Sequence, residues 1–299
     1  RFDALAAAGV ELREGDIGDP SSMDRALAGV CPRLVIHCAA FMGGWSSPQA
    51  YRRVNVEGTR SIATWAAAAG ASRFIYVSSV TVYGLPPRER VDETAPHRSV
   101  GMPYADSKIE AENVVRETGS RGLPFTILRP GDVYGPRSHE WVTKLVASMR
   151  AGRLPLIGGG RGLVNVTCIE NLVDAIEAAA ATPAAEGSDY IITDGAPVTW
   201  KSYLTALAAA AGCRAPRLSI PSSLAWAMAF ALEAASSLTG RRPPLSRLGM
   251  RLLTARCGYD IGKARRELGW SPRVGLTEGM RHVAVWLHET DQRRDASSP

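Results

Sequence analysis

The sequence lacks the cysteine pattern of a structural zinc site or of a disulfide-stabilised domain. It holds five widely separated cysteines and no CxxC pair. An odd, scattered set of thiols is typical of a reducing compartment, so neither a metal ion nor a disulfide is expected. No signal-peptide pattern is visible either, and the two observations together predict a cytoplasmic protein. The cysteines are Cys31, Cys38, Cys168, Cys213 and Cys257.

Long hydrophobic runs are also scarce. The most apolar stretch, SSLAWAMAFALEAASSLTG at 222–240, is short for a membrane span and carries Glu233 near its middle. A buried or interfacial helix is therefore predicted there, and stable membrane insertion is not.

Basic runs interleaved with aromatic residues are missing, although the formal net charge is +6 and the sequence pI is about 9.2. The arginines form only short clusters, such as Arg241-Arg242 and Arg265-Arg266. This pattern does not predict a nucleic-acid partner, but it suits a small anionic ligand such as a dinucleotide.

The chain does contain an alternation of strand-like and helix-like segments. Its 299 residues, 45% of them hydrophobic, suit one large domain or two lobes. Extended segments are predicted at 10–16, 33–40, 73–79 and 124–130, and helices at 20–30, 51–70 and 103–119. Strands separated by helices of this length predict βαβ units, a parallel sheet and right-handed crossovers.

Beyond residue 130 the alternation loosens. A helix is predicted at 138–152, strands at 163–169 and 188–193, and a helix at 170–181, followed by a mainly helical remainder. The fold class is therefore α/β, a doubly wound, Rossmann-like parallel sheet with a smaller, mainly helical C-terminal lobe. We predict a cofactor domain of residues 1–134 and 163–193 and a substrate lobe of residues 135–162 and 194–299.

A tyrosine and a lysine lie four residues apart in the segment PYADSK (103–108). On a helix, Tyr104 and Lys108 share one face, and an ammonium beside a phenol lowers the phenol pKa from about 10 toward neutrality. Such a phenol can exchange a proton with an alcohol or ketone. The spacing alone arises often by chance, so an exposed helical turn is the alternative.

Two serines end the apolar segment RFIYVSS (73–79). The carboxyl ends of parallel strands are where such sheets bind ligands, so a serine there can hold a reacting oxygen. A serine that caps a loop is the alternative for Ser78 and Ser79.

Seven segments, in the same order as in the family, resemble the extended short-chain dehydrogenases/reductases, which include nucleotide-sugar epimerases and dehydratases and 3β-hydroxysteroid dehydrogenases. They cover nearly the whole chain: EGDIGD, VIHCAA, VNVEGT, YVSSVTVYG, PYADSK, LRPGDVYGPR and YDIGKARRELGWSPRVGLTEGM. The segments are individually short, and their joint order carries the resemblance. The 3β-hydroxysteroid dehydrogenase-like branch is the most similar.

The resemblance implies an NAD or NADP cofactor and a role for each matching residue. Tyr104 is then the acid/base, Lys108 also binds the nicotinamide ribose, and Asn55 supports the active site. Ser79, in preference to Ser78, holds the substrate oxygen. The residues that the resemblance places at the cofactor are Asp16, Ile17, Cys38, Ala39, Ala40, Asn55, Tyr104, Lys108, Pro130, Gly131 and Val133.

The family's glycine-rich phosphate loop does not appear in this chain. The segment RFDALAAAGVEL resembles the part of the family's fold that comes directly after the second strand, so a first strand, helix and second strand of roughly thirty residues are expected upstream. The residue that selects NAD or NADP is then unreadable, and residues 1–299 alone are expected to bind cofactor weakly. GGGRG (158–162) has no helical pattern directly after it and is predicted to be a turn.

The substrate class rests on weaker patterns. Val164 stands about where nucleotide-sugar enzymes of the family carry an arginine, with Arg161 nearby, and Val80-Thr81 replaces the dehydratase Asp-Glu pair. The loop FMGGWSSP, with Phe41, Met42 and Trp45, is predicted to line an apolar pocket, and ordinary loop packing is its alternative.

We therefore predict an NAD(P)-dependent oxidoreductase for a secondary alcohol or ketone, with a steroid-like compound as one option. A nucleotide-sugar 4-epimerase and a non-catalytic NAD(P)-sensing protein are the alternatives. The resemblance also implies a homodimer formed through helices 51–70 and 103–119 as an option.

Overall fold

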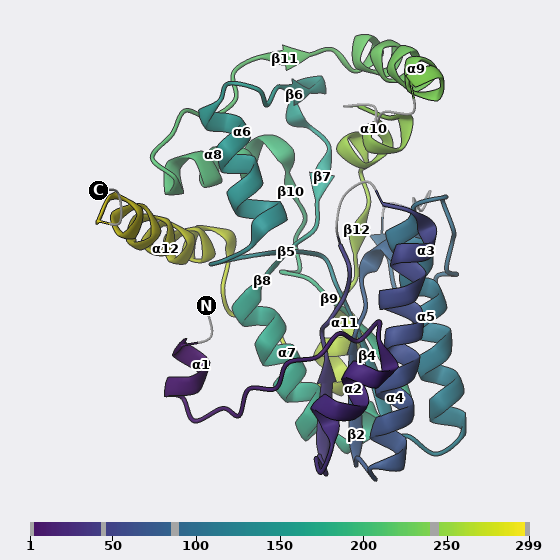
Figure 1. The fold of residues 1–299 in the computed structure, drawn as a ribbon. Helices are drawn as coiled ribbons and strands as arrows, with labels where there is room; N and C mark the ends of the chain where they lie inside the picture. Colours follow the sequence, from purple (N-terminus) through teal and green to yellow (C-terminus); the bar gives the residue numbers. More distant parts are fainter. Residues whose placement is uncertain (1–2, 43–45, 85–89, 240–244, 297–299) are drawn as a thin grey trace. The chain divides into compact units, whose positions relative to one another are not determined.

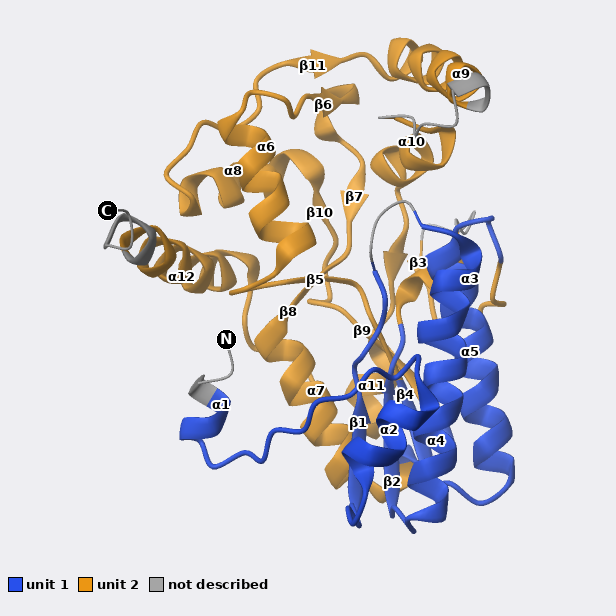
Figure 2. Cartoon of the chain, viewed as in Figure 1, with its two compact units in different colours: residues 1–78, 99–127, 185–188 blue, residues 79–98, 128–184, 189–299 orange. Residues whose placement is uncertain are grey.

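The computed structural model describes residues 3–42, 46–84, 90–239 and 245–296. The chain forms two compact units (Figure 2). Unit 1 comprises residues 1–78, 99–127 and 185–188, and unit 2 comprises residues 79–98, 128–184 and 189–299. The chain therefore passes from one unit to the other between Ser78 and Ser79.

The main sheet has four strands in the order β1-β2-β4-β9. These are β1 (Leu34–His37), β2 (Arg73–Val77), β4 (Phe125–Pro130) and β9 (Ser188–Ile192). β1 and β2 run parallel, with Leu34 opposite Arg73 and His37 opposite Tyr76. All six residues of β4 are buried, as expected for a strand covered on both faces. The predicted α/β fold with a parallel sheet is confirmed.

The helical segments of unit 1 are α1 (Asp3–Ala7), α2 (Pro20–Leu27), α3 (Pro48–Tyr51), the π-helix η1 (Arg52–Glu57), α4 (Gly58–Ala68) and α5 (Pro103–Ser120). α4 and α5 flank the sheet, whereas α1 lies apart from it (Figure 1). The helix predicted at 51–70 is present, with a π-turn inside it, and ends at Gly70, whose positive φ of 72° suits a glycine. Small residues of α4 and α5, including Ala63, Ala66 and Ala111, pack into the core with Phe74 of β2.

The extended segment predicted at 10–16 forms no strand. Val10 and Leu12 are 47% and 46% exposed, and no described residue pairs with their backbone as a strand partner. Alternating apolar residues do not make a strand unless a neighbouring strand accepts their backbone hydrogen bonds, and this prediction was wrong for that reason. Ile36 of β1, the strand at the edge of the sheet, is likewise 46% exposed.

Unit 2 contains short two-stranded pairings. β5 (Asp132–Tyr134) runs parallel to β8 (Val166–Cys168), and β7 (Leu163–Val164) runs antiparallel to β10 (Val198–Thr199). β6 (Leu156–Ile157) pairs with β11 (Ser219–Ile220), and β3 (Arg90–Val91) with β12 (Gly258–Tyr259). The single strand predicted at 163–169 is thus two strands with different partners. Residues 158–160 form a short 3-10 turn (η4) in which Gly159 has a φ of 72°, and a strand follows it.

The helices of unit 2 are η2 (Val80–Tyr83), η3 (His139–Thr143), α6 (Lys144–Arg150), α7 (Ile169–Ala181), η5 (Pro183–Ala185), α8 (Trp200–Ala210), α9 (Ser222–Thr239), α10 (Arg247–Thr254), α11 (Gly262–Glu267) and α12 (Leu276–Ala296). Some of them contribute to a second apolar core, while α9 and α10 pack on each other in a smaller cluster. Tyr134, Tyr203, Leu207 and Val283 are among the buried residues of the second core. In the part of the chain that the structure describes, no helix has the length and apolar character needed to cross a bilayer.

Candidate active site

Tyr104 and Lys108 lie in the first two turns of α5. The helix begins at Pro103, which is suited to a first helical position because its missing N–H has no intrahelical partner to lose. Tyr104 is half-buried, whereas the Lys108 side chain is 2% exposed. A lysine is rarely buried to this degree unless its ammonium is held by partners.

The Lys108 ammonium is held at the end of β2. Its Nζ donates to the Val77 carbonyl oxygen at 2.8 Å and to the Tyr76 hydroxyl at 3.2 Å, and lies 4.7 Å from the Tyr76 ring centroid. Burial lowers the pKa of Lys108 to about 8, while the Glu112 carboxylate acts in the opposite direction. The α5 lysine therefore sits near its protonation midpoint at mildly basic pH.

The Ser78 hydroxyl is hydrogen-bonded to a buried carboxylate. Its Oγ donates to Glu112 Oε1 at 2.6 Å, and the Glu112 side chain is fully buried, with Arg116 Nη2 at 3.7 Å from its other oxygen. A charged acceptor of this kind holds the Ser78 proton strongly. The Ser78 hydroxyl proton is therefore engaged by Glu112, and Ser79 stays the predicted catalytic serine.

Ser79 is the first residue of unit 2 and is 7% exposed. Its Oγ accepts the Thr81 backbone N–H at 3.2 Å and so caps η2. A hydroxyl that accepts one bond still has a proton to donate, so the capping role and a role in holding a substrate oxygen are compatible.

Asn55 links three segments of unit 1. It is 1% exposed and lies in the π-helix η1, whose widened turn is a form often found at functional sites. Its Oδ1 accepts the Phe41 N–H at 2.6 Å, and its Nδ2 donates to the Phe41 carbonyl at 3.1 Å and to Ser107 Oγ at 2.9 Å. Ser107 Oγ in turn donates to the Tyr104 carbonyl at 2.7 Å. Asn55 therefore ties the loop after β1 to the turn that carries Tyr104.

His37 extends this network beneath Asn55, and the sequence did not single it out. The Thr59 hydroxyl donates to the Asn55 carbonyl at 2.6 Å and faces His37 Nε2 at 3.0 Å. Since the Thr59 proton is already used, His37 donates from Nε2 in the tautomer that this network assigns. Burial, with a smaller effect of Lys108, lowers the His37 pKa to about 4, so the ring is neutral. The only signal in the sequence is a polar residue at the end of an apolar strand.

Five further predicted cofactor residues of unit 1 lie after β1 and before α2. Cys38 and Ala39 are exposed and Ala40 is half-buried. The Cys38 thiol itself is partly desolvated although the residue as a whole is exposed, and this desolvation raises its pKa, with Lys108 acting in the opposite direction. Asp16 is exposed; Gly18 donates its N–H to Oδ1 at 2.8 Å, and this bond first and Arg53 second lower the Asp16 pKa.

These residues fit a dinucleotide. Ile17 packs so closely on Gly58 that a Cβ there would lie 3.0 Å from its side chain, which holds the Asp16 loop against α4. The loop presents an ionised carboxylate that can accept from an adenine or ribose donor, and the exposed small side chains of Cys38 and Ala39 leave room for a flat ring. All five stay predicted cofactor residues, with Asp16 predicted at the adenine: Asp16, Ile17, Cys38, Ala39 and Ala40.

The remaining cofactor candidates belong to unit 2. Pro130 is buried at the end of β4, and Val133 is half-buried in β5. Gly131 donates its N–H toward the Ile192 carbonyl and Thr167 Oγ1, both at 3.0 Å, and a Cβ on it would lie 2.1 Å from the Asn165 carbonyl oxygen. Packing against Asn165 is sufficient to require a glycine at this position.

The predicted substrate loop is only partly described. Phe41 packs its ring edge-on against Tyr51, with centroids 4.9 Å apart, and Met42 is 52% exposed. Trp45 lies outside the described residues. The Phe41 contact agrees with ordinary loop packing, and the exposed Met42 is available to a ligand.

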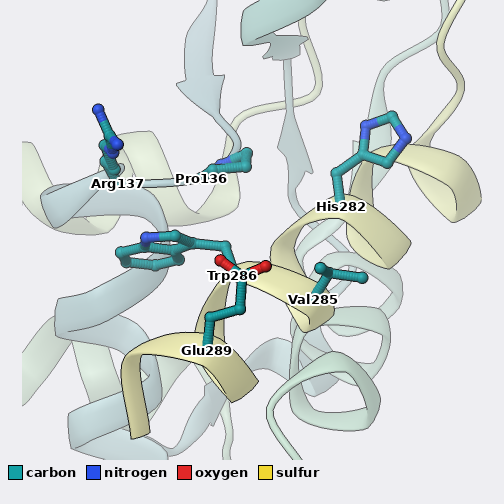
Figure 3. A pocket seen from close by; sticks show the side chains of 6 residues that line it. All are labelled: Pro136, Arg137, His282, Val285, Trp286 and Glu289. Carbon is teal, nitrogen blue, oxygen red and sulfur yellow. The ribbon is translucent and has the colours of Figure 1, made fainter. Parts of the chain in front are cut away.

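A separate open hollow of about 490 Å³ lies in unit 2. Four of its six lining residues belong to α12, and Figure 3 shows their side chains together with those of Pro136 and Arg137. His282 there also faces Glu170 Oε1 at 2.9 Å. The hollow includes none of the predicted site residues. Its lining residues are Pro136, Arg137, His282, Val285, Trp286 and Glu289.

A parallel sheet flanked by helices, with a tyrosine and a buried lysine one turn apart on α5, is the architecture of an extended short-chain dehydrogenase/reductase. Residues 2–193 match the sequence model of the NAD dependent epimerase/dehydratase family, and the chain belongs to that family.

Individual relatives differ in their activities. The chain is 33% identical over 294 residues to the 2-alkyl-3-oxoalkanoate reductase of Stenotrophomonas maltophilia (strain K279a), a match that covers 94% of this chain and 88% of the relative. It is 29% identical to the 3beta-hydroxysteroid-dehydrogenase/decarboxylase isoform 1 of Arabidopsis thaliana, over 94% of this chain and 67% of that protein. The fold is similar to that of a UDP-glucose 4-epimerase from Thermotoga maritima, with a TM-score of 0.75, 21% identity and coverage of 95% and 86%.

Proposed function

We propose that this chain is an NAD(P)-dependent oxidoreductase that interconverts a secondary alcohol and a ketone. The observation that carries the proposal is Lys108, an ammonium buried at 2% exposure and anchored on Val77 and Tyr76, one helical turn from Tyr104. A lysine with a purely structural role is rarely buried to this degree, because removing its ammonium from water is costly. A lysine that supports a proton-exchanging phenol needs to be shielded from water and held in place.

Each residue has a separate task in this proposal. Tyr104 passes its phenol proton to the ketone oxygen, or takes it from the alcohol, and Lys108 stabilises the phenolate that results. The Ser79 hydroxyl donates a hydrogen bond to the same substrate oxygen and keeps its proton. Asn55 positions Tyr104 through Ser107. When bound, the nicotinamide supplies or accepts the hydride. NAD and NADP are both open as the cofactor.

An apolar substrate is favoured over a nucleotide sugar. Val164, at the position where an arginine would grip a diphosphate, is a buried residue of β7 paired with Val198. The similar proteins named above include a reductase of 2-alkyl-3-oxoalkanoates and a 3β-hydroxysteroid dehydrogenase/decarboxylase, and both names describe a carbonyl or carbinol on an apolar skeleton. We therefore place a long-chain or steroid-like ketone first among the substrate classes.

Turnover of matched substrates tests the proposal. The purified protein is incubated with NADH or NADPH and a 2-alkyl-3-oxoalkanoate, a 3-oxosteroid or a UDP-sugar, and loss of reduced nicotinamide is followed together with product analysis. Consumption with an apolar ketone, lost in Tyr104→Phe, is the expected result. Conversion of a UDP-sugar to its 4-epimer without net consumption would establish the epimerase instead, and cofactor binding without any turnover would establish a sensing protein.

We also propose a cytoplasmic location. The cofactor domain comprises residues 1–134 and 163–193, and the substrate lobe comprises residues 135–162 and 194–299. A homodimer is a further option. In unit 1, α4 and α5 pack side by side and are bridged by Arg60 and Glu117, with 3.1 Å between Nη1 and Oε2. A helix pair of this kind offers a two-fold contact surface. Light scattering of the wild-type protein measures whether a dimer exists. The same measurement on an Arg60→Glu variant tests whether the dimer forms through the α4–α5 surface.

A further inference from the structure

Helix α9 turns an apolar stripe outward. Leu224, Met228 and Phe230 are 54%, 40% and 63% exposed. Leu224, Ala227, Met228 and Ala231 follow the i, i+3, i+4, i+7 spacing of one helical face, and all four are exposed. Phe230, at i+6, is exposed beside this stripe and extends the apolar surface of the helix. A surface helix normally directs that stripe to the core and its charged residues outward, so α9 has the opposite polarity.

The inward side of α9 is already packed. Ala225 and Ala229 are buried against Met250 of α10. The one charged residue of α9, Glu233, accepts the Arg247 backbone N–H at 2.8 Å and pairs with the Arg247 guanidinium at 2.5 Å. The outward stripe is therefore a second apolar face, distinct from the one that folds α9 onto α10.

Exposed arginines lie in the segments on either side of α9: Arg217 precedes β11, and Arg247 and Arg251 belong to α10, which packs on α9. The Arg247 guanidinium lies 5.8 Å from the Phe230 ring centroid, and Arg217 and Arg251 are exposed and form no ion pair with a described residue. The charge is concentrated in the sequence as well, because residues 214–256 contain seven arginines and one glutamate, whereas the rest of the chain contains 28 basic and 28 acidic residues. The formal net charge of the whole protein therefore comes from the sequence segment that contains α9.

The chemistry of this face selects its partner. An apolar stripe with arginines in the segments that flank its helix, Arg217 and Arg251 among them without an ion pair to a described residue, complements a surface that is apolar inside and anionic outside. A second copy of the chain is a poor partner, because a two-fold contact would bring like-charged arginines together. Since α9 does not have the character of a membrane span, it would lie in the interface plane instead of crossing it.

We propose that the outward face of α9, with Arg217, Arg247 and Arg251, is a docking surface for an anionic phospholipid bilayer. Phe230, Leu224 and Met228 enter the boundary between headgroups and acyl chains, and the arginines contact lipid phosphates. The proposal is independent of the catalytic assignment, since it uses none of the site residues.

Vesicle flotation tests this docking. The protein is mixed with vesicles of phosphatidylcholine alone or of phosphatidylcholine and phosphatidylglycerol, at low and high salt. Flotation with the anionic vesicles that weakens as salt rises is expected. Arg217→Glu combined with Arg251→Glu lowers the partition constant by about 25-fold or more, at about fivefold per lost arginine. The matched control, Arg281→Glu, changes an exposed arginine of α12, outside this surface, and is expected to have a much smaller effect.

An apolar pair of variants completes the test. Phe230→Glu abolishes flotation, whereas Val173→Glu, at a residue of α7 that is 45% exposed, retains it. Circular dichroism checks that each variant is folded, and Tyr104→Phe floats like wild type whether or not the catalytic assignment holds. Absence of flotation with anionic vesicles, or equal flotation of Phe230→Glu, overturns the proposal. A wild-type dimer that Phe230→Glu dissociates, without vesicle binding, would make this face a self-association surface instead.

Discussion

Helices α5 and α9 are each 18 residues long, but they bury opposite kinds of side chain. α5 buries Lys108 and Glu112, while α9 buries alanines and exposes Leu224 and Phe230. The buried charges of α5 are each satisfied within unit 1, Lys108 by Val77 and Glu112 by Ser78.

The difference separates two uses of a helix surface. Burying a charge costs several kcal/mol unless partners are supplied, so a fully partnered buried lysine and carboxylate indicate a site whose chemistry repays that cost. Exposing apolar groups costs the folded protein little, and a contiguous stripe of them indicates a surface that meets something apolar. Variants of the two helices can test this contrast, and substitutions at α5, the helix of the proposed catalytic residues, are expected to have the stronger effects.

Replacing Tyr104 with phenylalanine removes the proton donor and leaves the ring in place. Turnover is expected to fall by about 10²- to 10⁴-fold, the usual contribution of a positioned acid or base. Steady-state kinetics measure the loss, and an unchanged thermal midpoint with retained cofactor affinity is the control. Undiminished turnover would remove α5 from the mechanism.

The two adjacent serines are expected to respond differently. Ser79→Ala lowers turnover by about 10²- to 10³-fold, as when one donor to a reacting oxygen is removed, with little change in stability. Ser78→Ala instead leaves the buried Glu112 carboxylate short of a donor and lowers the free energy of unfolding by about 1–3 kcal/mol. Kinetics and denaturant unfolding of both variants measure the split, and the reverse pattern would mean that the roles are exchanged.

Lys108 makes stability depend on pH in a defined window. Its folded pKa of about 8 lies below its ordinary value of 10.5, so between these pH values the unfolded chain binds more protons than the folded one. Stability contributed by this residue therefore rises with pH across that window, by up to about 3 kcal/mol, and is constant below it. Denaturant unfolding from pH 7 upward, compared with Lys108→Met, isolates the effect, and parallel curves for the two proteins would contradict it.

The exposed face of α9 is expected to contribute almost nothing to folding. Phe230→Ser changes the free energy of unfolding by less than about 0.5 kcal/mol, because the side chain stays largely in water in the folded protein. Phe74→Ala, in the core of unit 1, costs about 3–5 kcal/mol and is the matched control. A large loss in Phe230→Ser would show that this ring is part of the fold and not of a docking surface.

Local patterns allowed much of the fold to be predicted. The helices at 103–119 and 170–181 and the strands within 33–40, 73–79 and 124–130 have the expected type because periodicity and terminating residues act over one or two turns. The apolar run at 33–40 forms the edge strand β1, in which Leu34 and Ile36 are exposed, so it is not covered on both faces as a continuous apolar run suggests. The segment at 10–16 failed because a strand depends on a partner elsewhere in the chain. The strand predicted at 163–169 divided because each half found a different partner.

The candidate site was predictable where its residues are neighbours in the sequence. Tyr104 and Lys108 are one turn apart, so their shared helix face follows from helix geometry. Ser78 and Glu112 are 34 residues apart, and Asn55 and Ser107 are 52 apart, so no local pattern connects them. His37 and its neutral state depend on burial among residues of three different segments.

Local sequence patterns and the order of the motifs along the chain were enough to establish the alternation of strands and helices, the family, and the Tyr104–Lys108 spacing. Tertiary packing was needed to bury Lys108, to hold Ser78 but not Ser79 on Glu112, and to turn the apolar stripe of α9 outward. Exposure and hydrogen-bond partners depend on which distant segments pack together. Side chains of the same type therefore have different chemistry once water is excluded from one and left around the other.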